Sequence, residues 1–356
     1  MTEMIAAEPG VAERLIHRLR RSEAVTALAD AIRKAVRAGH PVMTTGCGTS
    51  EHAAMAVAAL LNDAVQPPAG REVRAVQALE ALRRPLNDGV LIGVSHEGGT
   101  HATNEALRTA GEGGARTALI TVSARSPGAE VAGIVIETEE QDQSWCHTVG
   151  YLSPLVTGVV LGAELAGGRV DGRAIRALLD VNDDHRAAAV LAAGLTGIDR
   201  VLVAGSGVDL VTARELALKI AEGARLPAGA FDVETLLHGH LAAANRWTGL
   251  VLIRTDTTEE PDAIAPRIDR LLSAARLLGM PVAAILGQRA SKAVDGDATA
   301  AGRIVLARTA RVPEPVAALL APVIPIQLLT ERLARARGVN PDTLGREDEA
   351  QAAAHA

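Results

Sequence analysis

Two series of short apolar segments, separated by longer stretches with helical spacing, constrain the fold of this chain most. The segments of the first series are PVMTT, VLIGVS, TALITV and AGIVIET, at 41–45, 90–95, 117–122 and 132–138. Runs of this length, rich in Val and Ile and alternating with helices, are typical of parallel strands that are buried on both faces. The sequence therefore predicts a doubly wound α/β domain.

A second series follows the same plan. Its segments are RVLVAGS, LVLIRT, VAAILG and RIVLAR, at 200–206, 250–255, 282–287 and 303–308. The strand, Gly-x-Gly turn and Ala-rich helix at 42–60 align without a gap with 201–219, which favours an internal duplication. We therefore predict two α/β domains in tandem, with the organisation 1–40 helical segment, 41–185 first domain, 186–343 second domain and 344–356 tail.

Charge and composition argue against several classes of partner. A net charge of −6 and 1% aromatic residues leave neither a basic stripe nor stacking platforms for nucleic acid. The N-terminal segment lacks the pattern of a leader peptide, and no uninterrupted apolar stretch approaches the roughly 20 residues of a membrane span, so we expect a cytoplasmic protein. Cys47 and Cys146 are too few for a disulfide framework or a four-cysteine zinc site, and no His pair has HExxH spacing, so we expect no metal.

The stretch TTGCGTSEHAA carries the first candidate site, where the strand at 41–45 ends and a helix begins. Gly46 and Gly48 allow a close backbone approach, and Thr49 and Ser50 add hydroxyl groups. Helix N-termini beyond the carboxyl ends of parallel strands bind anions. The alternative is that Thr49 or Ser50 simply caps the helix. Neither GxGxxG nor GxxxxGK[ST] is present, so neither a dinucleotide nor a nucleoside-triphosphate loop is indicated.

A second turn of the same kind, VSHEGGTHATNEAL, follows the strand at 90–95. It also combines glycines and hydroxyls with the start of a helix. Two such turns on neighbouring strands of one sheet can converge on one anion.

The second domain contains a helix with three charged residues on one face. Glu215, Lys219 and Glu222 have i, i+4 and i+7 spacing, and His238-Gly239 follows the helix. Taken separately, the triplet fits a solvated ion-pair stripe and His238 fits a structural histidine.

The ordered combination of these features resembles the sugar isomerase (SIS) family, and in particular the isomerase part of glucosamine-6-phosphate synthase. The Cys-Gly-Thr-Ser turn, the Ser-x-Ser-Gly-x-Thr turn, the Glu-x-x-x-Lys-x-x-Glu helix and the His-Gly pair all have counterparts here, over 35–343. The resemblance implies two tandem SIS-type domains with flavodoxin-like sheets. It also implies a substrate-binding set, which includes Thr148 of QSWCHTVGY. The members of this set are Cys47, Gly48, Thr49, Ser50, Ser95, His96, Glu97, Gly98, Thr100 and Thr148.

One residue departs from the family pattern. Glu97 stands where the family usually has its second Ser. A carboxylate beside a phosphate dianion costs Coulomb energy unless it is protonated, paired or turned away. Glu97 could instead meet an amine of the substrate, or pair with His96.

The resemblance implies aldose–ketose isomerisation of a phosphosugar, with or without coupled deamination of an amino-sugar phosphate, and no glutaminase domain. Glu222 would be the base that moves a proton between C1 and C2, and Lys219 would orient the acidic residues or stabilise the enediolate oxygen. By the same analogy His238 assists ring opening, reaching into the neighbouring subunit of a homodimer. No redox cofactor is expected, because the reaction is internal.

Alternatives to an isomerase remain at this point. A non-catalytic phosphosugar-binding or regulatory SIS protein would keep the two turns, whereas a nucleotide-dependent oxidoreductase would need a dinucleotide turn that AGSGVDLVTA does not provide.

Many family members also have a lysine near the C-terminus that closes over the sugar. RGVNPD at 337–342 resembles the segment that leads to it, but the last lysine here is Lys292.

Overall fold

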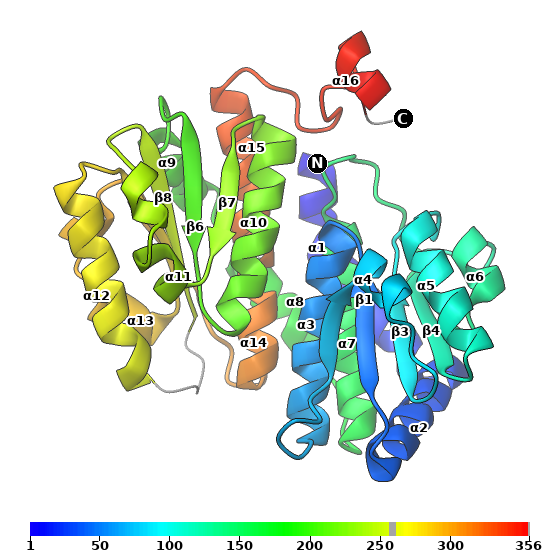
Figure 1. Cartoon of the computed structure of the whole chain (residues 1–356). Coiled ribbons are helices and arrows are strands. Elements are labelled where there is room, and N and C mark those ends of the chain that lie inside the picture. Colours follow the sequence, from blue (N-terminus) through cyan, green and yellow to red (C-terminus); the bar gives the residue numbers. More distant parts are fainter. Residues whose placement is uncertain (256–260, 355–356) are drawn as a thin grey trace. The chain divides into compact units, whose positions relative to one another are not determined.

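The computed structural model describes residues 1–255 and 261–354, and the chain packs as two compact units (Figure 1). The first-sheet unit consists of 8–142 and 149–176, and the second-sheet unit consists of 1–7, 143–148 and 177–356. Each unit contains one parallel five-stranded sheet, which confirms the predicted fold class. Whereas the sequence suggested a division after residue 185, residues 177–185 and the short segment 143–148 pack with the second sheet.

The first sheet has the strand order β2-β1-β3-β4-β5. Its strands are β1 (Val42–Gly46), β2 (Arg74–Gln77), β3 (Val90–Val94), β4 (Arg116–Thr121) and β5 (Ile134–Glu137). The chain runs from the interior strand β1 to the edge strand β2 and then returns to the other side of β1 to form β3. The point between β1 and β3, where the direction of winding reverses, is where ligands bind in open α/β sheets.

Helices cover both faces of this sheet (Figure 1). One face carries α2 (Glu23–Ala38), α3 (Thr49–Val65) and α7 (Val149–Leu165), and the other carries α4 (Ala78–Arg83), α5 (His101–Glu112) and α6 (Pro127–Val131). Two further helices, α1 (Thr2–Leu19) and α8 (Gly172–Val181), each contain residues of both units.

The expected N-terminal helical segment is two helices. The side chain of Ser22 accepts a hydrogen bond from the amide of Val25 and so starts α2 as a new helix. Gly39, at φ 74°, ends α2 with its N–H bonded to the carbonyls of Ala35 and Val36. Only two residues, Arg20 and Arg21, separate the end of α1 from Ser22, the N-cap of α2.

The second sheet repeats the topology of the first, with the order β10-β9-β8-β6-β7. Its strands are β6 (Arg200–Ala204), β7 (Ala228–Phe231), β8 (Thr248–Arg254), β9 (Val282–Leu286) and β10 (Gly302–Val305). Its helices are α9 (His185–Gly194), α10 (Val208–Ala224), α11 (Val233–Leu237), α12 (Pro261–Leu277), α13 (Gln288–Ala293), α14 (Glu314–Leu320), α15 (Val323–Ala336) and α16 (Glu349–Ala354). The equal strand order of the two sheets supports the duplication seen in the sequence.

The edge strands β2 and β7 were not anticipated from the sequence. Each has four residues, none of them buried, and β2 reads RAVQ. A short, half-exposed edge strand lacks the continuous apolar run that marks a central parallel strand.

Among the described residues, the stretch Glu314–Ala336 is long and apolar enough to cross a membrane by length and composition alone. However, 89% of its apolar window is buried inside the structure. Its helices α14 and α15 pack against α10, so the stretch behaves as core of the second-sheet unit.

Candidate functional site

The first candidate turn leaves β1 at the point where winding reverses. β1 and β3 are parallel neighbours, with Thr45 opposite Gly93, so the second turn begins beside the first. Gly46 is required for this close packing, because a Cβ atom there would lie 2.6 Å from the backbone of Ser50. The structure thus brings the two turns to one edge of the first sheet, as predicted.

The start of α3 shows whether the hydroxyl groups of Thr49 and Ser50 serve as helix caps, the alternative to an anion site. The N-cap of α3 is Gly48, at φ 58°, and it has no side-chain cap hydrogen bond. At the second turn, Thr100 is the N-cap of α5 and its side chain likewise makes no cap bond. Neither Thr49 nor Ser50 therefore caps α3, and both helix N-termini meet the shared edge without a side-chain acceptor. Such ends are favourable places for an anion.

The second turn is held in one shape by contacts within the unit. Gly98 has a φ of 66°, and a Cβ atom there would lie 2.2 Å from Oγ of Ser126. Its carbonyl accepts hydrogen bonds from Asn104 Nδ2 at 3.0 Å and from the amide of Gly128 at 2.8 Å. Ser95 Oγ donates to Thr100 Oγ1 at 3.3 Å. The hydroxyls of Ser95 and Thr100 are therefore held next to each other.

Cys47 supports the first turn. Burial raises the pKa of the Cys47 thiol, and a hydrogen bond with Thr103 only partly opposes this. The amide Nε2 of Gln77, on the edge strand β2, lies 3.7 Å from its Sγ atom. Since a thiol with a raised pKa is a poor nucleophile, Cys47 shapes the turn and carries no charge there.

The two residues between Ser95 and Gly98 face different surroundings. His96 is buried, and its Nε2 accepts a hydrogen bond from the amide of Asp142 at 3.0 Å. Glu97 is exposed, and its carboxylate accepts a hydrogen bond from Nε2 of Gln141 at 3.3 Å. His96 thus fixes the segment after β5, while Glu97 stays at the solvent side of the turn.

The charged triplet of α10 is not a solvated stripe. Lys219 and Glu215 have side chains that are each 1% exposed, whereas Glu222 is 25% exposed. Lys219 Nζ lies 2.5 Å from Glu222 Oε2 and 3.8 Å from Glu215 Oε1. Burial alone lowers the pKa of Lys219, but Cys146, Glu215 and Glu222 together outweigh it and raise that pKa above its ordinary value. The helix therefore holds a buried cation that fixes one partly exposed carboxylate.

The segment 143–148 packs in the same unit as this helix. The thiol of Cys146 is 4.0 Å from the carbonyl oxygen of Lys219. Thr148 is fully buried, and its carbonyl accepts a hydrogen bond from Gln327 at 3.4 Å. Thr148, which the resemblance assigned to the phosphate ligands, thus belongs to the second-sheet unit, unlike the two hydroxyl turns.

The tail beyond Pro341 adds a cation that the sequence analysis missed. The guanidinium of Arg346 lies 3.6 Å from the centre of the Trp145 ring, and Glu347 pairs with Arg225. A hydrogen bond from Thr343, together with Arg225, lowers the pKa of Glu347 to about 2. A tail that ends without lysine therefore still places a positive charge beside the segment 143–148. The sequence signal for this charge was RGVNPD at 337–342, which resembles the family segment that leads to the C-terminal lysine.

His238 lies on an exposed loop of the second-sheet unit. Its side chain is 70% exposed, and its Nε2 is 3.0 Å from Oε1 of Glu234, which Arg267 also contacts. The hydrogen bonds from His238 and Arg267 lower the pKa of Glu234. An open cavity of about 520 Å³ lies here, lined by His238, Gly239 and His240 among others. His238 is therefore not a satisfied core histidine.

The second sheet has an equivalent reversal point between β6 and β8, but a carboxylate of the chain fills it. Asp209 aligns with Ser50, and its carboxylate accepts hydrogen bonds from the amide of Thr255 at 3.0 Å and from its hydroxyl at 2.5 Å. A buried anion already present would repel a second one. The two sheets thus differ in what they can bind, despite their shared topology.

Comparisons with known proteins show the fold. The chain is similar to the C-terminal domain of glucosamine-fructose-6-phosphate aminotransferase from Francisella tularensis, with 18% identity, a TM-score of 0.78 and coverage of 96% of this chain and 97% of that one. Tagatose-6-phosphate ketose/aldose isomerase from Escherichia coli has 18% identity and a TM-score of 0.72, with coverage of 96% of this chain and 94% of that one. Glucosamine-6-phosphate deaminase from Thermotoga maritima has 16% identity and a TM-score of 0.71, with coverage of 96% of each chain. No protein-family profile and no curated protein sequence matches the chain. The resemblance to the SIS family is thereby confirmed in its fold.

Proposed function

We propose that this protein is a sugar-phosphate isomerase-type enzyme that interconverts the aldose and ketose forms of a phosphosugar. The observation that carries the proposal is the buried Lys219, which holds the partly exposed carboxylate of Glu222 within 2.5 Å. A protein that only binds a sugar phosphate has no need of this costly buried charge. Solved proteins of the same fold are named as an isomerase, a deaminase and an aminotransferase of sugar phosphates, which supports this class of substrate.

The phosphate of the substrate binds at the two turns of the first sheet. Thr49, Ser50, Ser95 and Thr100 supply hydroxyl donors, and α3 and α5 present uncapped N-termini. The glycines at 46, 48 and 98 allow the backbone to approach. This set needs no metal to balance the phosphate charge, because helix ends and hydroxyls are sufficient at such sites.

Glu222 serves as the base. In the open-chain aldose it takes the proton from C2, which leaves an enediol, and returns a proton to C1 to give the ketose. Lys219 is a positioning residue: with 1% of its side chain exposed, it orients Glu222 and does not reach the substrate. Of the two roles considered for Lys219, burial favours the orienting one.

His238 assists ring opening, and the protein acts as a homodimer. The exposed position of this side chain suits a group that completes the site of a second subunit. Glu234 keeps the imidazole in place, since Arg267 holds the other oxygen of that carboxylate.

The nature of the sugar depends on Glu97. Its carboxylate is exposed and, among the described residues, contacts a neutral amide, that of Gln141. It is therefore suited to an ammonium group of an amino-sugar phosphate. For such a substrate, isomerisation is coupled to release of ammonia.

A substrate panel tests the proposed function. Purified protein is incubated with hexose 6-phosphates and hexosamine 6-phosphates, and both ketose formation and ammonia release are measured. We expect turnover of at least one member, and ammonia only from the hexosamines. Saturable binding of several members without any turnover would instead establish the alternative, a phosphosugar-binding or regulatory protein.

Removing single hydroxyls from the two turns is expected to weaken phosphosugar binding. Ser50→Ala and Thr100→Val each delete one donor to the phosphate, which costs about 1 to 3 kcal/mol for a hydrogen bond to a charged group. Isothermal titration gives the dissociation constants, with Ser291→Ala on α13 as the matched control. Equal binding by wild type and both turn variants would show that the phosphate is held elsewhere.

A further inference from the structure

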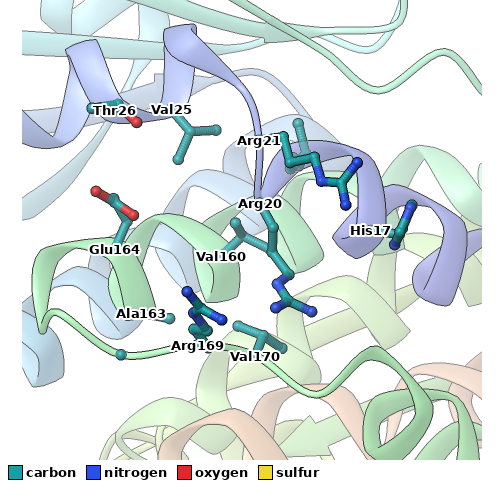
Figure 2. A pocket seen from close by; sticks show the side chains of 12 residues that line it. His17, Arg20, Arg21, Val25, Thr26, Val160, Ala163, Glu164, Arg169 and Val170 are labelled. Atoms are coloured by element: carbon teal, nitrogen blue, oxygen red, sulfur yellow. The ribbon is translucent and has the colours of Figure 1, made fainter.

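A basic pocket lies in the first-sheet unit, and none of the turn residues lines it (Figure 2). It has a volume of about 420 Å³ and is formed by the end of α1, the start of α2 and the end of α7 with the loop that follows. Its basic groups are His17, Arg20, Arg21 and Arg169. A volume of this size accommodates a small organic ligand.

The backbone that carries the arginines is ordered. The amide of Arg20 donates to the carbonyl of Ile16 at 3.1 Å, and that of Arg21 donates to Arg18 at 3.2 Å. On the other side, the amide of Gly168 donates to the carbonyl of Ala163 at 2.8 Å and closes α7 just before Arg169. The backbone segments from which these side chains project, far apart in the sequence, are therefore ordered and lie around one space.

The basic groups of the pocket lack anionic partners, whereas several other arginines of the unit have them. In the same unit, Arg14 pairs with Glu140, Arg18 with Glu139, and Arg176 with Glu13. Within the described residues, His17, Arg20, Arg21 and Arg169 take part in no ion pair and no side-chain hydrogen bond. Although the chain has a net charge of −6, these unpaired basic side chains line a single pocket.

The arrangement of the lining is asymmetric. In Figure 2 the guanidinium groups of Arg20 and Arg169 point into the same space beside Val170, and that of Arg21 lies near His17. The carboxylate of Glu164 lies on the opposite side, and Val160 forms part of the wall. The pocket thus combines a cationic side with an apolar surface.

We propose that this pocket binds a phosphorylated small organic molecule, at a second site separate from the two turns. Guanidinium groups match phosphate oxygens in pairs of hydrogen bonds, and more than one arginine suits a ligand with two or more phosphate charges. The apolar wall contacts the organic part of the ligand, and Glu164 faces its hydroxyl groups. The proposal does not depend on the function assigned above.

The test uses the full chain carrying Ser50→Ala and Thr100→Val, so that the turns contribute little. ATP, fructose 1,6-bisphosphate and inorganic tripolyphosphate are titrated by calorimetry at fixed ionic strength. We expect saturable binding of at least one organic phosphate. The double variant Arg20→Ala/Arg169→Ala is expected to weaken this binding at least about tenfold, because each substitution removes a charge-assisted contact. Arg84→Ala with Arg116→Ala removes the same charge from the same unit and is expected to leave binding unchanged.

Three results would overturn the proposal. The first is equal binding in the Arg20/Arg169 variant and its parent, and the second is an equal loss in the Arg84/Arg116 control, which would reveal a mere effect of net charge. The third is tripolyphosphate binding as tightly as both organic phosphates, which would remove any role for the apolar wall. The four arginines are exposed, so thermal unfolding of the variants is expected to match that of the parent.

Discussion

Glu222→Gln is expected to lower kcat for aldose–ketose conversion by about 10²- to 10⁴-fold, the usual contribution of a general base. The amide keeps the shape of the side chain and can still accept a hydrogen bond from Lys219, but it cannot take a proton from carbon. Binding of the phosphosugar is expected to persist, because the turns belong to the first-sheet unit. Initial rates and isothermal titration on the same preparation separate the two effects.

A matched control for this experiment is Glu234→Gln, which removes a carboxylate that contacts His238 and Arg267 and takes no proton from the substrate. It is expected to reduce kcat far less than Glu222→Gln. A Glu222→Gln enzyme with nearly normal kcat would contradict the assignment of the base.

The same variant also tests the shared site. When inactive Glu222→Gln and His238→Ala proteins are mixed and their subunits exchange, one intact site can form in each mixed dimer if the two residues come from different chains. Partial recovery of activity is expected. Failure to recover activity after exchange has been confirmed by mass spectrometry would place both residues in one subunit's site.

Lys219→Met is expected to lower the free energy of unfolding by about 3 to 5 kcal/mol, the range for breaking a buried ion pair. The substitution removes the cation that lies 3.8 Å from the Glu215 carboxylate, whose side chain is 1% exposed. Urea unfolding followed by circular dichroism measures the change. The control is Lys292→Met on α13, an exposed lysine for which a change within about 0.5 kcal/mol is expected. A similar effect of both substitutions would mean that the buried charge is not what stabilises α10.

A further variant separates loss of the cation from loss of packing. Adding Glu215→Gln and Glu222→Gln to Lys219→Met removes the stranded charges, so part of the lost stability is expected to return. No recovery would assign the effect to packing alone.

The pH dependence of the Lys219 effect follows from the direction of its shift. The folded pKa lies above the unfolded value, which is about 10.4 for lysine, so the stabilisation is complete below that pH and is lost as the pH rises through the folded pKa. The difference between wild type and Lys219→Met is therefore expected to stay constant between about pH 7 and 9.

The amino-acid sequence by itself determined the central strands, the two hydroxyl turns and the composition of the α10 triplet. These features are local: an apolar run, a glycine at a tight turn and the i, i+4, i+7 spacing of Glu215, Lys219 and Glu222 are visible within one window. Gly46 illustrates this, because a Cβ atom there would meet the backbone of Ser50 in the same turn, whereas Gly98 is required by a contact with Ser126 that the local sequence does not show.

Only the tertiary structure decided which of these local patterns became buried and what they face. The residues of the edge strands β2 and β7 carry little apolar signal. These strands form because the neighbouring strands β1 and β6 offer them hydrogen bonds. The triplet of α10 is identical in spacing to a surface stripe, and it is the packing of α15 and of the segment 143–148 that buries Lys219. Arg20 and Arg169 share a pocket although the whole first sheet separates them in the chain. Burial and charge pairing depend on long-range contacts, and periodicity along the sequence does not encode these contacts.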